Sequence, residues 1–233
     1  MAEEPQTAHP RVGRPVPDWT SRPRPGRDLL SGRYCRLEPL DPERHAEQLW
    51  TAFELDTTGV GWTYLPYGPF AGFADFRHWV GKVAQADDPL FFAILDTDGR
   101  AVGVASYLRI DPAMGSIEVG HIHYSPLLQR TRAATEAMYL LAWRAFEELG
   151  YRRYEWKCDD LNAPSRRAAE RLGFTYEGTF RQDRIYKGRN RDTAWYSIID
   201  TEWPAVREAL EAWLDPGNFD EQGNQVARLA SAK

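Results

Sequence analysis

Residues 115–174 constrain the fold of this chain more than any other stretch. Their hydrophobic pattern predicts four consecutive elements, namely a strand over 116–124, a long amphipathic helix, a strand over 152–158 and a short helix that begins at Asn162. Apolar residues recur every three or four positions through the long helix as far as Leu149, and Gly150 follows where a left-handed C-terminal cap is common. The stretch is therefore a β-α-β-α unit, which needs a sheet whose faces helices can cover.

The turn before the long helix is a candidate anion-binding site. A helix that begins directly after a strand presents unpaired backbone N–H groups and the positive end of its dipole. The turn over 129–134 also carries Arg130 and Arg132. These features favour a phosphate-binding loop, whereas the alternative is that the two arginines form a solvated surface at the helix start.

The remaining elements define the fold class. Hydrophobic patterns predict further strands over 33–40, 90–95, 100–110, 174–186 and 191–200, a helix capped by Asp41, and helices over 73–86 and 201–214. Asp98-Gly99 supplies a hairpin turn between two of these strands. The sequence thus predicts an α+β fold with a mixed, mostly antiparallel sheet of about seven strands and helices on both faces.

Length and composition predict one domain with extended ends. A chain of 233 residues with 42% apolar content can bury a full core. We expect an extended Pro- and Arg-rich arm over 1–31, one domain over 32–214 and a tail over 215–233. In the arm, Trp19 and the leucines at 29–30 are candidates for docking on the domain, and a disordered arm is the alternative.

Charge, cysteine content and hydropathy exclude several classes of protein. The formal net charge of −5 at pH 7 argues against a nucleic-acid binder. Cys35 and Cys158 lack metal-ligand spacing and suit two free thiols in a reducing compartment. Glu3 and Glu4 without a following apolar run argue against a signal peptide, and no segment has the roughly 20 apolar residues of a membrane span. We therefore expect a cytoplasmic protein that binds neither nucleic acid nor membrane.

Glycine, proline and aromatic residues crowd the segment over 59–70, GVGWTYLPYGPF, and predict a loop. This aromatic loop carries Trp62, Tyr64, Tyr67 and Phe70. Two interpretations stay open at this point. The aromatic side chains either line a substrate pocket or cover the hydrophobic core.

Local motifs give most of the chain a resemblance to a known family. They are the strand EVGHIHY, the turn and helix start QRTRAATEA, the N-x-x-S and R-L-G-F segments between Asn162 and Phe174, and the closing hairpin sequence RDTAWYSI. With these motifs at this spacing, residues 32–202 resemble the GNAT superfamily of acetyl-CoA-dependent N-acetyltransferases, in particular its ribosomal-protein N-terminal acetyltransferase (RimJ/RimL-type) branch. The resemblance implies the acyl-CoA N-acyltransferase (GNAT) fold. It also implies direct transfer of an acetyl group from acetyl-CoA to a primary amine in a ternary complex.

The resemblance further implies which residues bind coenzyme A. The family's turn usually reads Q/R-x-x-G-x-G/A, so Gln129 and Ala134 match, while Arg132 takes the place of a glycine that lets backbone approach phosphate. The implied cofactor-binding residues are Tyr124, Gln129, Arg130, Thr131, Arg132, Ala133, Ala134, Thr135 and Asn162. Asn162 also suits a purely structural role as a helix N-cap.

Amide formation needs a base for the amine proton and an acid for the departing thiolate. Glu118 is the candidate base, because a carboxylate in a buried strand is costly unless it is used, and the resemblance places the branch's strand glutamate there. Pairing with an arginine is the alternative role for Glu118. Ser165 is the candidate acid, with Tyr186 and Tyr196 in reserve.

The acceptor is the least defined part of this interpretation. Trp62, Tyr64, Tyr67 and His123 are the candidate substrate-binding residues. The resemblance implies a protein N-terminus as the acceptor, whereas the aromatic loop also suits an antibiotic, a polyamine or an amino acid. Because Arg132 stands in the glycine position, a non-catalytic acyl-CoA sensor is a further alternative.

Three smaller expectations concern metal, strand phase and the closing hairpin. His121 and His123 lack a third ligand at metal-binding spacing, so no metal is expected. Strict alternation places Glu118 on the same face as Tyr124, and a bulge would reverse this phase. The basic hairpin over 181–191 either attracts an acidic peptide or the 3′-phosphate of coenzyme A, or it protects a sheet edge, and it is also where a homodimer would pair.

Overall fold

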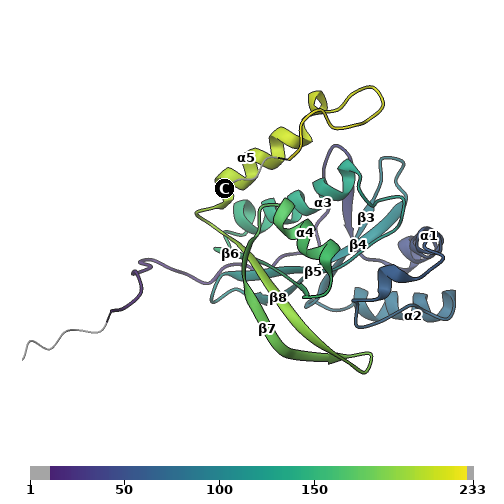
Figure 1. The fold of residues 1–233 in the computed structure, drawn as a ribbon, viewed down its shortest axis with the longest axis horizontal. Coiled ribbons are helices and arrows are strands. Elements are labelled where there is room, and N and C mark those ends of the chain that lie inside the picture. Colours follow the sequence, from purple (N-terminus) through teal and green to yellow (C-terminus); the bar gives the residue numbers. More distant parts are fainter. Residues whose placement is uncertain (1–10, 230–233) are drawn as a thin grey trace, which may run out of the picture.

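One eight-stranded sheet organises residues 11–229, the part of the chain that the computed structural model describes (Figure 1). Its strands, in the order β1-β2-β3-β4-β5-β6-β8-β7 across the sheet, are β1 (Leu30–Ser31), β2 (Arg36–Pro39), β3 (Leu90–Leu95), β4 (Ala101–Asp111), β5 (Ser116–Tyr124), β6 (Arg153–Asp159), β7 (Thr175–Tyr186) and β8 (Arg189–Ile199). The helices are α1 (Pro42–Phe53), α2 (Phe73–Ala84), α3 (Arg132–Trp143), α4 (Ala163–Arg171) and α5 (Trp203–Leu214), with short helical segments η1 (Val60–Trp62), η2 (Arg144–Glu148) and η3 (Pro216–Asn218).

This architecture confirms the predicted α+β class. All neighbouring strands pair antiparallel except β5 and β6. The sheet has eight strands rather than about seven, because Leu30–Ser31 adds a two-residue strand at one edge. The long helix continues beyond α3 through the π-helical segment η2, and Gly150 ends it with a φ of 68°.

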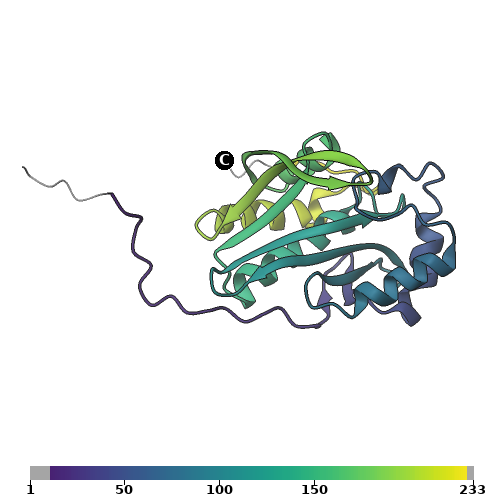
Figure 2. The same ribbon diagram turned by 90° about the horizontal axis from the view of Figure 1, so that it is seen from below.

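Helices cover both faces of the sheet, as Figures 1 and 2 show. One apolar cluster packs α3, α4 and α5 on one face, which we call the α3 face, and a second packs α1 and α2 on the other, the α1–α2 face. Strand β3 is buried on both sides, because Phe92 and Ile94 belong to the first cluster while Phe91 and Ala93 belong to the second. Its continuous apolar run follows from this double burial.

The two segments outside the predicted domain dock on it. Trp19 donates its indole N–H to the carbonyl of Ala113 at 2.8 Å, and Leu30 is buried in the α3-face core while Leu29 is exposed. In the tail, Trp213 donates to the side chain of Gln225 at 2.9 Å. The first ten residues of the arm, with Glu3 and Glu4, and the last four residues of the tail lie outside the described residues.

The structure also describes the hydropathy of the helices and the state of the two cysteines. Within residues 11–229, no helix is long and apolar enough to cross a membrane. Cys35 and Cys158 are both buried free thiols.

Strands β5 and β6 form the pair that shapes the centre of the sheet. Their parallel ladder joins Ser116–Val119 to Arg153–Trp156 and then stops, although β5 continues to Tyr124 and β6 to Asp159. The two strands therefore separate toward their C-terminal ends. The backbone that faces this gap has no partner in the sheet ladder.

A bulge in β5 lies at the start of this gap. Gly120 pairs with Ser106 of β4 and His123 pairs with Val104, so two residues of β5 oppose one of β4, and His121 adopts a φ of 51°. The bulge reverses the side-chain phase that strict alternation predicts. Glu118 consequently shares the α1–α2 face with His123, whereas Tyr124 packs on the α3-face core.

The carboxylate of Glu136, on α3, fastens the N-terminal part of the chain to the helix layer. It accepts hydrogen bonds from the backbone N–H groups of Arg33, Tyr34 and Cys35 at 2.8, 2.6 and 2.8 Å, and the residue is only 6% exposed. Burial, reinforced by this negative charge, raises the pKa of the Cys35 thiol. One buried carboxylate thus accepts hydrogen bonds from three consecutive backbone N–H groups in the loop that connects β1 and β2.

Replacing Glu136 by alanine should lower the free energy of unfolding by about 3 kcal/mol, because one buried and two part-buried N–H groups lose their acceptor at about 1 kcal/mol each. Urea unfolding followed by tryptophan fluorescence measures this change. Glu208→Ala, at an exposed position on α5, is the matched control and should change stability by no more than about 0.5 kcal/mol. Equal stabilities of the two variants would contradict the role of Glu136.

Candidate active site

The predicted catalytic residues Glu118 and Ser165 lie on opposite faces of the sheet, near the point where β5 and β6 separate. Glu118 lies on the α1–α2 face, where it contacts Lys157 of β6. Ser165, on α4, accepts a hydrogen bond from the indole N–H of Trp156 at 3.0 Å, and Trp156 belongs to the α3-face core. A molecule that passes through the gap would meet one residue from each side.

The turn before α3 has the local structure of a capped helix start. Thr131 is the N-cap, and its hydroxyl accepts from the N–H of Ala134 at 3.1 Å and donates to the carbonyl of Leu128 at 2.7 Å. Gln129 donates its side-chain amide to the carbonyl of Tyr124 at 2.9 Å, which ties the turn to the end of β5. Arg130 is exposed and has a φ of 61°. The polypeptide thus leads directly from the separating strand into the positive end of α3.

Arg132 occupies the first helical position, where the family usually has glycine. Its guanidinium carbon lies 4.6 Å from the ring centroid of Tyr34 and 4.7 Å from that of Phe219. These are cation–π distances. The side chain is therefore directed at two aromatic rings, one from the segment before β2 and one from the C-terminal tail.

A second cation approaches the same helix start from α4. Arg171 donates to the hydroxyl of Thr135 at 3.1 Å and lies 4.6 Å above the ring of Trp213. Thr135 is buried, and its neighbour Ala134 accepts a hydrogen bond from the phenol of Tyr124 at 3.3 Å. Two arginines thus flank the first turn of α3, both resting on aromatic rings.

Asn162 caps α4 at the opposite side of the gap. Its side-chain oxygen accepts from the N–H of Ser165 at 3.2 Å, so the capping role is present in the structure. The loop before it is anchored by Asp159, whose carboxylate accepts from the N–H of Leu161 at 2.9 Å and from the phenol of Tyr186 at 2.8 Å. Tyr186 therefore holds the β6–α4 loop rather than standing free beside it.

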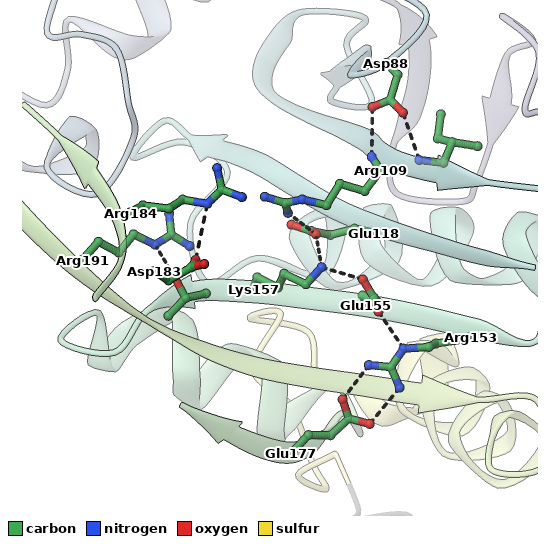
Figure 3. Close-up of polar contacts among 12 residues, drawn as sticks. Asp88, Arg109, Glu118, Arg153, Glu155, Lys157, Glu177, Asp183, Arg184 and Arg191 are labelled. Carbon is green, nitrogen blue, oxygen red and sulfur yellow. Dashed lines mark hydrogen bonds and ion pairs between the residues drawn. The ribbon is translucent and has the colours of Figure 1, made fainter. Parts of the chain in front are cut away.

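Glu118 is part of a charged network that crosses the sheet (Figure 3). Its Oε2 atom pairs with both Arg109 of β4 and Lys157, whose amine lies 2.9 Å away. Lys157 also reaches Glu155 at 2.7 Å and lies 3.7 Å from the ring centroid of Trp195. Glu118 is 3% exposed. Its buried charge is thus compensated by two cations, as a carboxylate at such a site requires.

His121 and Tyr67 form a pair beside this network. The phenol oxygen of Tyr67 and Nδ1 of His121 are 2.9 Å apart. Burial, followed by the positive charges of Arg109 and Arg191, lowers the pKa of His121 to about 4, and burial raises the pKa of Tyr67. Both side chains are therefore neutral near pH 7, and they hold the aromatic loop against the bulge of β5.

Trp62 and His123 lie in the α1–α2-face core. Trp62 stacks on the imidazole of His123 with ring centroids 3.7 Å apart, and Phe53 contacts the same imidazole at 4.3 Å. The two residues are 5% and 4% exposed. The burial of Trp62 and His123 is therefore explained if the aromatic loop covers the hydrophobic core.

Contacts from three segments close the site at one end. Tyr64 donates to the carbonyl of Leu161 at 3.1 Å, which joins the aromatic loop to the β6–α4 loop. Lys187, at the tip of the β7–β8 hairpin, donates to the carbonyl of Trp62 at 2.7 Å. Figure 2 shows the hairpin arching over the sheet. The hairpin, the aromatic loop and the β6–α4 loop thus surround the place where β5 and β6 separate.

The structure adds site residues that the sequence analysis did not single out. Arg109 and Lys157 hold Glu118, and they come from the two strands that flank β5. The alternation of side chains within β6 could have indicated Lys157, because it places Glu155 and Lys157 on one face of the strand. The register between β5 and β6, which pairs Glu118 with Glu155, is needed to turn that signal into a contact.

Comparison with known proteins identifies the family. Residues 35–175 match the acetyltransferase (GNAT) domain family. A protein of Bacillus subtilis (strain 168) described as "Putative ribosomal N-acetyltransferase YdaF" is 30% identical over 174 residues, which cover 72% of this chain and 90% of that protein. The chain therefore belongs to the GNAT acetyltransferase family and is an acetyl-CoA-dependent acyltransferase. This confirms the resemblance inferred from the sequence.

Solved structures agree with this assignment. A GCN5-related N-acetyltransferase from Brucella melitensis superposes with a TM-score of 0.90 at 49% identity, covering 92% of this chain and 97% of that chain. A probable acetyltransferase of the GNAT family from Chromobacterium violaceum gives a TM-score of 0.77 at 40% identity, covering 84% and 100% of the two chains. The GNAT fold predicted from the sequence is thus confirmed.

The buried imidazole of His123 should make the protein sensitive to acid. Burial lowers its pKa from 6.5 to about 4, so the unfolded chain binds a proton that the folded chain does not as the pH falls below 6.5. His123 should therefore reduce the free energy of unfolding by about 2 kcal/mol between pH 7 and pH 5. Urea unfolding of His123→Gln across this range should show a flatter pH dependence.

The exposed His78 on α2 supplies the control, since His78→Gln should leave the pH dependence of unfolding unchanged. The comparison uses the slope of stability against pH, so a uniform loss of stability in His123→Gln does not affect it. Parallel slopes for the wild type and His123→Gln would refute the assignment.

Proposed function

We propose that this protein acetylates a primary amine that enters on the α1–α2 face, with acetyl-CoA held from the α3 face through the gap between β5 and β6. The observation that carries the proposal is the placement of Glu118 and Ser165 on opposite faces at this gap. A base on the acceptor side and an acid on the donor side are what amide formation requires.

The residues around the gap fit coenzyme A. The turn over 129–134 leads into the positive end of α3, and Arg132 and Arg171 flank that end with positive charge. A pyrophosphate suits this combination of helix start and guanidinium groups. The backbone of β5 beyond Val119, which lacks a ladder partner on the β6 side, suits the amide groups of the pantetheine arm. When bound, acetyl-CoA supplies the activated acetyl group.

Glu118 is the proposed base. Its Oε2 is held by Arg109 and Lys157, whereas among the described residues Oε1 has no hydrogen-bond partner and lies toward Gly120, one residue before the bulge. One oxygen is therefore anchored, and the other lies toward the first residue of β5 beyond its ladder with β6. In this arrangement Oε1 takes a proton, directly or through water, either from the substrate ammonium before the neutral amine attacks or from the amine as its bond to the acetyl carbon forms.

Ser165 is the proposed acid. Its oxygen accepts the indole N–H of Trp156, and its hydroxyl hydrogen, which can be donated to the neighbouring sulfur of Cys158, can be donated instead to another acceptor. Asn162 fixes the backbone of Ser165 by capping α4. The hydroxyl would donate to the departing thiolate on the α3 face.

The acceptor we favour is a protein N-terminus, supported by the relative described as a ribosomal N-acetyltransferase. An extended peptide would present only its terminal amine to Glu118. A small amine is the second candidate, supported by the aromatic residues Tyr64 and Tyr67 beside the gap. A non-catalytic acyl-CoA sensor would bind the donor and transfer nothing.

Replacing the proposed base should lower kcat without lowering the affinity for acetyl-CoA. Glu118→Gln should reduce kcat with N-terminal peptides by about 100-fold or more, the usual contribution of a general base, and Ser165→Ala should do so by a smaller factor. Acetyl-CoA affinity, measured by calorimetry, should stay within about threefold of wild type. Glu208→Gln, at an exposed position on α5, is the control and should retain turnover. Unchanged kcat in Glu118→Gln would remove Glu118 from the mechanism.

Binding of the donor can be measured separately from turnover. Acetyl-CoA at 100 times its Kd should stabilise the fold by about 2.7 kcal/mol, a clear thermal shift, and 3′-dephospho-CoA should give a smaller shift. Absence of any shift at millimolar acetyl-CoA would contradict the proposal. A shift without turnover across peptides and small amines would favour the sensor.

A further inference from the structure

Three arginines from three strands converge beside the proposed base. Arg109 comes from β4, Arg184 from β7 and Arg191 from β8. Figure 3 shows the guanidinium groups of Arg109 and Arg184 pointing toward one another, with Arg191 next to Arg184. The arch of the hairpin thus brings its basic side chains over the charged network of the sheet.

The nearby carboxylates are distributed unevenly among these cations. Glu118 is shared between Arg109 and Lys157, and Asp183 pairs with Arg184 at 3.4 Å. Arg191 donates its Nε–H to the hydroxyl of Thr193 at 3.0 Å, and it has no carboxylate partner among residues 11–229. Within residues 11–229, Arg191 is therefore the cation of this cluster that has no carboxylate of its own.

Guanidinium groups that face one another repel, and a bound anion removes that repulsion. The side chains of Arg109 and Arg184 are 39% and 52% exposed, so their donors remain open to solvent. Guanidinium groups bind carboxylate and phosphate through two parallel hydrogen bonds. The cluster thus has the charge, the accessibility and the donor geometry of an anion site.

The position of the cluster connects it with the acceptor rather than the donor. Arg109 contacts Glu118 directly, and the charges of Arg109 and Arg191 both act on His121 at the bulge of β5. All of these residues lie on the α1–α2 face. The start of α3, where the pyrophosphate would bind, is on the opposite face. An anion held here belongs to the molecule that presents its amine to Glu118.

We propose that Arg109, Arg184 and Arg191 bind an anionic group of the acceptor, a carboxylate or a phosphate close to the amine that is acetylated. The inference rests on the proposed function and names its substrate class. Arg189 is an exposed arginine of the same hairpin, pairs with Tyr186 next to the hairpin tip, and serves as the comparison for general surface charge.

Matched acceptor pairs that differ only in the anion test the proposal. They are the amidated peptides Ser-Asp-Ala-Ala and Ser-Asn-Ala-Ala, free serine and serinamide, and O-phosphoserine amide and serinamide. We expect kcat/KM to be at least about tenfold higher for the anionic member of one pair, and that pair identifies the source of the anion. Raising the salt concentration should shrink the ratio, because the site is partly exposed.

Substitutions of single arginines test whether the preference for the anionic acceptor depends on Arg109, Arg184 and Arg191. Arg191→Gln should bring the kcat/KM ratio close to one, because it weakens binding of the anionic acceptor more than binding of the neutral one. Arg191→Lys should keep part of the preference, since it keeps the charge and loses the bidentate geometry. Arg189→Gln is the control and should keep the full ratio. Circular dichroism and melting temperature verify that each variant is folded.

A binding measurement separates this inference from the proposed function. Thermal-shift titrations with succinate and with inorganic phosphate, against succinamide at equal ionic strength, require no turnover. We expect one anion to stabilise the wild type and not Arg191→Gln. Equal kcat/KM within every acceptor pair would overturn the anion site while leaving the acetyltransferase intact. If no amine is acetylated, the proposed function fails, and the titration alone decides whether the arginines bind an anion.

Discussion

The short parallel ladder between β5 and β6 is the constraint on which the rest of the structure depends. It holds the two halves of the sheet together over Ser116–Val119 and Arg153–Trp156 and then ends, so a gap opens inside an otherwise continuous sheet. A parallel pair needs a crossover connection, and α3 supplies it. The helix start and the gap therefore adjoin by topology. The crossover from β5 through α3 to β6 thus creates both the turn before α3 and the gap between the two strands.

The bulge in β5 decides what this slot can do. By inserting one residue at the start of the gap, it returns Glu118 to the face of His121 and His123 and leaves Tyr124 on the other. The acidic side chain thus lies on the acceptor face, and the phenol lies beside the turn before α3. Buried charge on that face then requires the cations from β4 and β6, and those cations place a positive surface under the hairpin.

The fold could be predicted from the sequence because the patterns that indicate its elements are local. The alternation in 116–124, the periodicity of α3 and the asparagine cap of α4 each depend on neighbouring residues, and the observed elements match them closely. The partners of Glu118 depend on strand register, which alternation alone does not fix. The bulge left the phase of β5 open until its pairing with β4 was known. Site geometry was thus less predictable than the elements that carry it.

The departure at Arg132 shows how the chain ends become part of the site. The family match spans residues 35–175, whereas the aromatic partners of Arg132, Tyr34 and Phe219, lie on either side of it. Glu136 fixes the backbone beside Tyr34, and the tail that carries Phe219 is fastened through Trp213. A side chain where glycine is usual is therefore held by two segments that the family domain does not include. The substitution and these segments form one structural unit, and the turn before α3 depends on both.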